Sequence, residues 1–166
     1  MRKSELNVKE GGAVVVRAST DLEVEELLER AREISAEDGV IQLFDADKVV
    51  NKTHLIGAFV NAARTMESDE NIAKDHALEM LLFAGMTRQI GDAIKGVGAK
   101  DARDFVVFAD SPATFRKLSK HLKDYEDFRP SRAEQAKRAR RHFGIKDADN
   151  IGAQMLQKMA VTRLID

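Results

Sequence analysis

The sequence predicts a mixed α/β fold in which a small central sheet of about three to four strands is wrapped by about seven helices. Short β-branched and aromatic runs at 13–16, 40–44 and 105–108 are typical of buried strands. Longer segments between and after them repeat apolar residues at helical spacing. At 166 residues, the chain is long enough to bury a core without disulfides. We therefore expect one domain, 13–166, preceded by a polar tail at 1–12 that ends in two glycines.

The first half of the chain alternates predicted strands and helices. After the first strand, Thr20 or Asp21 caps an acidic helix. Glu23, Glu25 and Glu26 lie in its first turns, where the helix dipole favours negative charge. After the second strand, Asn51 or Thr53 caps a helix that runs to about Met66. These caps predict where both helices begin.

The stretch 72–100 is the predicted centre of the fold. Its residues from 78 to 84 are apolar almost without a break, and such a helix should be buried nearly all round. Gly85 then interrupts the pattern, and a short helix with a polar face follows. After the third strand come a helix with Pro112 in its first turn, a basic helix ending at Gly144, and a last helix from Ile151 to about residue 164.

Composition excludes several classes of function. The absence of cysteine excludes a disulfide framework, a zinc ribbon and a thiol nucleophile, and it fits a reducing cytoplasm. The sequence has neither a membrane-length apolar run nor a signal-like segment, so we expect a soluble protein. Because the net charge is −1, any nucleic-acid role requires a local basic patch. The 5% aromatic content argues against a reader that stacks on single strands.

Patterns that would indicate catalysis or metal binding are incomplete. The glycines at 96–100 lack the spacing of a phosphate loop, and 147–152 starts like a calcium loop but lacks its later ligands. His76 and Glu79 lie one helical turn apart without the second pair that a carboxylate metal site needs. His54 has no evident nucleophile or acidic partner. We therefore predict no catalytic residue, no metal site and no cofactor.

The last helix carries more apolar residues than one buried face requires. One stripe comprises Ile151, Met155 and Met159, whereas other apolar residues lie elsewhere around the cylinder: Leu156, Val161, Leu164 and Ile165. If the first stripe packs on the core, the other apolar residues of the helix are free to bind in the groove of a partner. The alternative is that a neighbouring helix covers it.

Basic residues concentrate on the helix that spans 132–141, where Glu134 is the one acidic residue. A solvated face and contact with an RNA backbone both remain open for this helix. Lys52, Lys74, Arg88 and Lys95 are scattered around the central stretch, and sequence spacing does not show whether the fold gathers them.

Three motifs together resemble the smallest subunit of the KEOPS (EKC) complex, the CGI/TPRKB family of kinase-binding proteins. They are NKTHLIGA at 51–58, ALEMLLFAGMTRQIGDAIKGVGAKD at 77–101 and ATFRKL at 113–118. The ending MLQKMAVTRL, at 155–164, is similar to the family's terminal helix. The resemblance implies a non-enzymatic regulatory subunit that binds the atypical kinase/ATPase of KEOPS. It also implies recruitment of tRNA by its 3′ CCA end for threonylcarbamoyl-adenosine modification at position 37.

The resemblance also implies two sets of site residues. The kinase-binding set lies on the last helix and comprises Met155, Leu156, Met159 and Leu164. The tRNA-binding set comprises Lys52, His54, Arg88, Gln89 and Lys95, in which the cations would contact phosphates and Gln89 a base. A purely local alternative pairs Arg88 with Asp92.

Two other functions remain as alternatives. The first is a stand-alone small-molecule-binding protein or enzyme with a pocket near Glu79, His76 and Arg88. The second is a homodimer, in which the surplus stripe of the last helix packs on a second copy when the subunit is isolated.

Overall fold

The computed structural model describes residues 12–164, so most of the predicted tail lies outside the described residues. By its internal contacts the chain divides into two compact units. Among the described residues, unit 1 comprises 12–46 and 98–128, and unit 2 comprises 47–97 and 129–164. The single domain expected for 13–166 stays a prediction.

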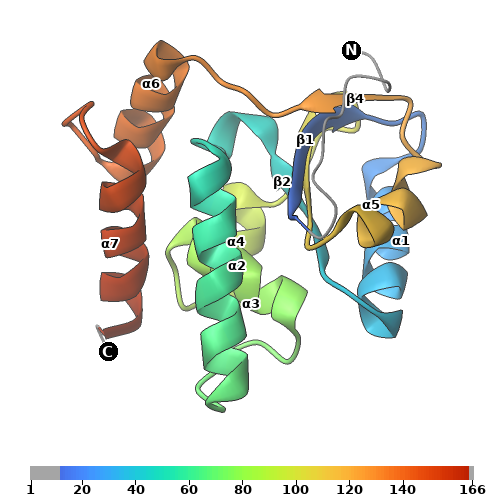
Figure 1. Cartoon of the computed structure of the whole chain (residues 1–166), viewed down its shortest axis with the longest axis horizontal. Helices are drawn as coiled ribbons and strands as arrows, with labels where there is room; N and C mark the ends of the chain where they lie inside the picture. The colour runs from blue at the N-terminus through green and yellow to red at the C-terminus, as the bar shows by residue number, and fades with distance from the viewer. Residues whose placement is uncertain (1–11, 165–166) are drawn as a thin grey trace. The chain divides into compact units, whose positions relative to one another are not determined.

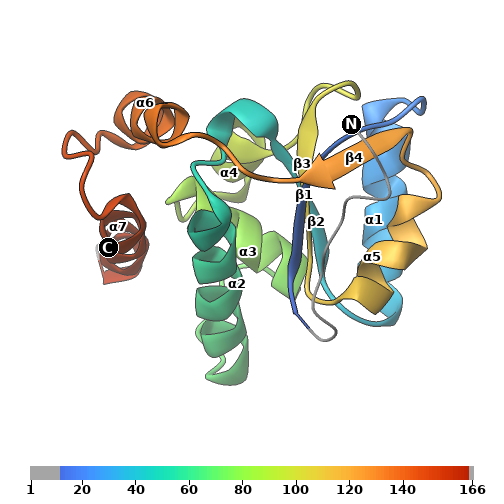
Figure 2. The ribbon, with the colours of Figure 1, turned by 45° about the horizontal axis from the view of Figure 1, so that its top comes forward.

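Unit 1 is built on an antiparallel sheet with the strand order β2–β3–β1–β4. The strands are β1 (Val14–Ser19), β2 (Ile41–Asp45), β3 (Phe105–Ala109) and β4 (Asp124–Asp127). Val107 lies opposite Val16 on one side and opposite Leu43 on the other, which places β3 inside the sheet (Figure 2). Every residue of β3 is buried, as its unbroken apolar sequence predicts.

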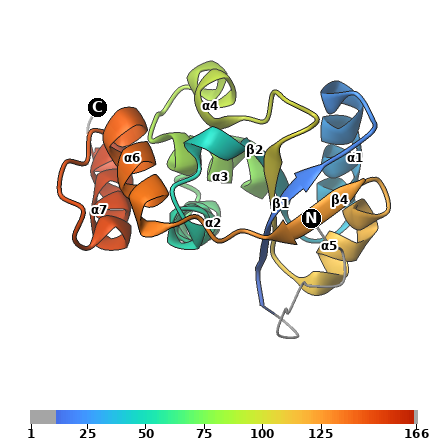
Figure 3. The same cartoon turned by 90° about the horizontal axis from the view of Figure 1, so that it is seen from above.

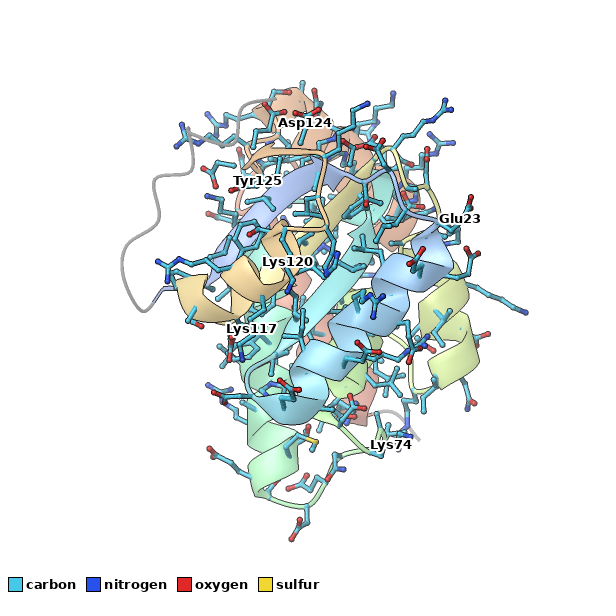
Figure 4. The ribbon with its side chains drawn as sticks, turned by 90° about the vertical axis from the view of Figure 1, so that its right-hand side faces the viewer. Glu23, Lys74, Lys117, Lys120, Asp124 and Tyr125 are labelled. Carbon is cyan, nitrogen blue, oxygen red and sulfur yellow. The ribbon has the colours of Figure 1, made fainter. Side chains whose placement is uncertain are left out.

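Two helices, α1 (Val24–Glu37) and α5 (Pro112–Ser119), cover one face of this sheet. Leu27 of α1 and Leu118 of α5 are completely buried in the same core as Val107. The two helices lie side by side, with Lys117 in α5 and Lys120 just after its last residue (Figure 4). Buried side chains on α1, α5 and alternate strand positions therefore form the core of unit 1.

The fourth strand is a correction to the sequence analysis, which treats 124–130 as a polar link. β4 has the sequence DYED, and none of its four residues is fully buried. It pairs with β1 at the edge of the sheet, where a strand needs no apolar face on both sides. Hydrophobic alternation therefore could not reveal it.

Unit 2 contains the other five helices. They are α2 (Lys52–Glu67), α3 (His76–Gly85), α4 (Ile90–Val97), α6 (Arg132–Phe143) and α7 (Ile151–Leu164); a short 3-10 turn, η2 (Ala46–Lys48), comes before them. Asn51 begins α2 by accepting a hydrogen bond from the His54 N–H at 2.9 Å. From Glu79 to Ala84, α3 is completely or almost completely buried, which confirms the predicted central helix.

Within unit 2, α7 runs alongside α2 (Figure 1) and also packs against α6 (Figure 3). Residues 12–164 thus contain four strands and seven α-helices, which confirms the mixed α/β fold class. Among these helices, none combines the length and the apolar character needed to cross a membrane.

Candidate partner-binding surface

The inner face of α7 holds this helix against the rest of unit 2. Met155 and Met159 are completely buried, and Ile151 is almost so. The helices α2 and α7 approach closely at Gly57, where an added methyl group would overlap Cδ2 of Leu156. A second close approach lies at Gly152, where a methyl group would come within 3.3 Å of Cγ2 of Thr53. The absence of side chains at these glycines permits the tight packing.

The far end of α7 is held by a buried ion pair. Nη1 of Arg163 lies 3.0 Å from Oε2 of Glu79, whose side chain is completely buried in α3. The Arg163 guanidinium also lies 4.1 Å from the ring centroid of Phe83, at a distance typical of a cation–π contact. Its carbonyl oxygen accepts a hydrogen bond from Nη1 of Arg88 at 3.1 Å. One residue therefore ties the end of α7 to α3 and to the turn before α4.

The Glu79 carboxylate is saturated with donors from the chain itself. Oε1 accepts from the N–H groups of Ile72 and Ala73, each at 3.0 Å, and Oε2 accepts from the Thr65 hydroxyl at 2.6 Å. Burial alone would raise the pKa of Glu79, but the hydrogen bonds from Arg163, Thr65 and Ala73 outweigh it and lower the pKa. Glu79 therefore remains ionised as a structural group and offers no free oxygen to a ligand. This geometry contradicts a ligand pocket that uses Glu79.

The outer face of α7 carries apolar side chains that the described part of the chain leaves exposed. The exposed fractions are 38% for Leu156, 43% for Val161 and 81% for Leu164. In α2, Ile56 and Val60 are 41% and 40% exposed and lie one helical turn apart around Gly57, the residue against which Leu156 packs. We call Ile56, Val60, Leu156 and Leu164 the outer apolar surface, whereas Val161 lines a separate hollow with Met86 and Lys158. The exposure of Leu156 and Leu164 shows that the described residues leave part of the apolar surface of α7 uncovered.

The buried methionines correct part of the predicted kinase-binding set. Met155 and Met159 have no exposed surface, so they cannot contact a partner directly while α7 stays in place. Of the other two predicted anchors, Leu164 is 81% exposed, whereas Leu156 is 38% exposed and packs through Cδ2 on Gly57 at the edge of the α2–α7 contact. The predicted role of these two leucines stays a prediction. Helical spacing defines the two stripes but does not show which one faces the core.

The predicted contact between His54 and tRNA is also corrected, because the side chain of His54 is buried. Its ring is buried; Nδ1 accepts from the Val50 N–H at 3.1 Å, and Nε2–H donates to the Ala84 carbonyl at 2.9 Å. The Phe143 ring packs edge-on at 5.0 Å. Burial lowers the pKa of His54 to about 4, against a smaller opposing effect of the Ala84 carbonyl. The residue is therefore a neutral structural group that joins α2 to α3.

The other predicted tRNA contacts are spread over three segments of unit 2. Lys52 is half-buried in the first turn of α2, whereas Arg88, Gln89 and Lys95 are exposed around the start of α4 and along it. Arg88 donates to the carbonyl of Arg163, rather than pairing with Asp92 as in the local alternative. Their role in tRNA binding stays a prediction.

A basic hollow beside α6 was not predicted from the sequence. Four exposed cations line it, three from α6 and one from the loop that follows: Lys137, Arg140, Arg141 and Lys146. The hollow has a volume of about 370 Å³, and its apolar floor includes Ile145 and Ile151. The i, i+3, i+4 spacing of the α6 cations indicates a shared face, but Lys146 joins them only because the chain turns at Gly144, where φ is +66°.

A metal centre is not formed by the described residues. Within 12–164, no three histidine, aspartate or glutamate side chains gather in a way that could hold a metal ion. His76 instead stacks on Phe59 at 4.6 Å between ring centroids and hydrogen-bonds the Phe59 carbonyl at 3.1 Å.

Comparisons with known proteins indicate a protein that binds a partner protein. Residues 16–164 match the family described as kinase binding protein CGI-121. The chain is 33% identical to the Regulatory protein Cgi121 of Methanocaldococcus jannaschii over 125 aligned residues. This alignment covers 74% of the present chain and 83% of the relative. The chain belongs to the CGI-121 family, and the resemblance found in the sequence is confirmed. This membership supports a regulatory, non-catalytic role.

Proposed function

We propose that this chain is a non-catalytic regulatory subunit of the KEOPS complex. In this role it binds and supports the atypical kinase/ATPase subunit and helps recruit tRNA, by its 3′ CCA end, for threonylcarbamoyl-adenosine modification at position 37. We expect it to act in the cytoplasm. Membership in a family described as kinase-binding supports the partner, and the outer apolar surface is the structural observation that carries the proposal.

The outer apolar surface has the chemistry of a protein-binding site. Burying a large apolar side chain contributes about 1.5–3 kcal/mol, and clustered residues of this kind dominate the energy of many interfaces. Leu156 and Leu164 lie on a helix that the buried methionines and the Glu79–Arg163 pair hold in one position. A partner therefore meets a preformed surface and loses little binding free energy to ordering it.

The proposal is tested by mixing the purified chain with the atypical kinase on a size-exclusion column. We expect the two proteins to elute together as a heterodimer. Separate elution at micromolar concentrations would contradict the proposed kinase binding. The chain alone should be run as a control, because elution as a dimer would show that the chain pairs with a second copy when the kinase is absent.

The tRNA part of the proposal needs its own measurement. A full-length tRNA transcript and the same transcript lacking its terminal CCA are titrated with the full-length chain. We expect the truncated transcript to bind more weakly. Equal affinity for both would contradict recognition of the CCA end, while leaving the kinase-binding proposal intact.

A further inference from the structure

We propose that the basic hollow beside α6 binds the phosphate backbone of tRNA, at a position separate from the contacts expected around α4. This inference rests on the tRNA role proposed above and assigns a binding surface to it. Its residues are Lys137, Arg140, Arg141 and Lys146, around a hollow that contains Asp147 as its one carboxylate.

The structure separates the cations of α6 into two groups with different roles. Arg138 is buried; its Nη1 donates to the Val49 carbonyl at 3.1 Å, and its Nη2 lies 3.6 Å from Glu134. Arg138 therefore holds α6 to the start of α2. Lys137, Arg140 and Arg141 are instead exposed and line the hollow.

The four cations of the hollow are not neutralised by the described part of the chain. Among residues 12–164, none of them has a carboxylate within ion-pair distance. Asp147, whose Oδ1 accepts a hydrogen bond from the Asp149 N–H at 2.9 Å, is the one carboxylate among the lining residues, so the four cations leave a formal charge of about +3 there. A local charge of this size, in a chain whose formal net charge is −1, attracts a polyanion to one place.

The cations of the hollow suit the phosphate groups of a nucleic-acid backbone more than its bases. Two of the four cations are arginines, whose planar guanidinium groups can bind two phosphate oxygens at once. Among the described residues, no aromatic side chain lines the hollow, so they offer no platform there for stacked bases. We therefore expect backbone contacts that contribute affinity and salt dependence without reading sequence.

The test compares a triple variant, Lys137→Gln/Arg140→Gln/Arg141→Gln, with a matched control on another helix. The control is Arg116→Gln/Lys117→Gln/Lys120→Gln, which removes three exposed cations at and just beyond the end of α5 in unit 1 (Figure 4). Both variants lose the same charge, and both lose cations from the last turn of a helix. Binding of full-length tRNA is measured by fluorescence anisotropy over a range of salt concentrations.

For the α6 variant we expect tRNA binding to be weaker by at least about tenfold. The slope of log K against log salt should also be less steep by about 2 to 3 units, because each lost phosphate contact reduces the slope by about 0.7 to 0.9. The control should keep the slope and affinity of the unmodified chain. Co-elution of the α6 variant with the kinase should be unchanged, which shows that the chain is still folded.

Three results would overturn the inference. An unchanged slope and affinity in the α6 variant would place the tRNA contacts elsewhere and leave the proposed function standing. Competition by polyglutamate as effective as that of RNA at equal charge would show that the hollow is not a phosphate site. Absence of tRNA binding by the unmodified chain would contradict the proposed recruitment of tRNA itself.

Discussion

Arg163, near the end of α7, forms an ion pair with Glu79 of α3, in which Nη1 and Oε2 are 3.0 Å apart. The carboxylate is completely buried, whereas Leu164, the next residue after the arginine, is 81% exposed. One turn of α7 therefore contributes both an interior electrostatic contact and an exposed apolar side chain. The interior contact fixes how the outer face of the helix is presented.

Removal of this arginine should strongly destabilise the fold. Arg163→Ala leaves the Glu79 carboxylate buried without its cation, and breaking a buried pair in this way costs about 3–5 kcal/mol. Urea denaturation measures the free energy of unfolding. The control is Arg88→Ala, which removes only the exposed donor to the Arg163 carbonyl and should cost about 1 kcal/mol or less. Equal stability of the two variants would show that the buried pair contributes nothing.

The buried His54 predicts a loss of stability in mild acid. Its pKa is about 4 in the folded chain and about 6.5 when exposed, so the unfolded chain binds more protons between these values. Its stabilising contribution is therefore complete above pH 6.5 and is lost as the pH falls toward 4, by about 3 kcal/mol in total. Urea denaturation at each half pH unit measures this loss.

A second histidine provides the control for that measurement. Burial and the positive charge of Lys48 lower the pKa of His142, and Asp47 opposes them. His142→Asn should leave most of the pH dependence in place, whereas His54→Gln should remove most of it and also lower stability at pH 7. If the pH profile disappears with His142→Asn instead, the assignment to His54 is wrong.

The two stripes of α7 should respond differently to truncation. Met155→Ala opens a cavity in the core of unit 2 and should lower the free energy of unfolding by about 2–5 kcal/mol. Leu164→Ala removes an exposed side chain and should change it by about 0.5 kcal/mol or less. Thermal and urea denaturation of both variants measures the difference. A larger loss for Leu164→Ala would mean that the inner and outer faces have been reversed.

The close approach of α2 and α7 predicts a specific coupling between two residues. Gly57→Ala places a methyl group on Cδ2 of Leu156 and should destabilise the chain by about 1–3 kcal/mol. Adding Leu156→Ala should restore part of this loss, which a double-mutant cycle measures. Gly91→Ala in α4 is the control: its methyl group would meet no atom within 4 Å, so it should stabilise the helix by about 0.5–1 kcal/mol. Additive effects of the first two substitutions would contradict the contact.

The sequence predicted those parts of the fold that depend on local patterns. The strands β1, β2 and β3 are short apolar runs, and α3 is an apolar segment bounded by glycine, so each carries its own signal. The strand β4 carries none, because an edge strand needs only a neighbour with free backbone groups. The division of the chain into two units also depends on contacts that are distant in the sequence.

The candidate site was predictable only in outline. Helical spacing showed that α7 has two apolar stripes, but packing against α2 decided that Met155 is buried and Leu156 is partly exposed. His54 belongs to a motif of the family, yet its place in the core depends on contacts with Val50 and Ala84. The Glu79–Arg163 pair joins residues 84 positions apart, and no local pattern indicates it.

The most direct test of the account is the affinity of the atypical kinase for a variant of the outer apolar surface. Leu156→Asp should weaken binding by at least about 2 kcal/mol, roughly 30-fold in Kd, because a carboxylate would be desolvated against an apolar partner. The control is Ile94→Asp, at a side chain of α4 that is 50% exposed and lies outside this surface. Calorimetric titration should show the unmodified Kd for Ile94→Asp. An unmodified Kd for Leu156→Asp would contradict kinase binding through the outer apolar surface.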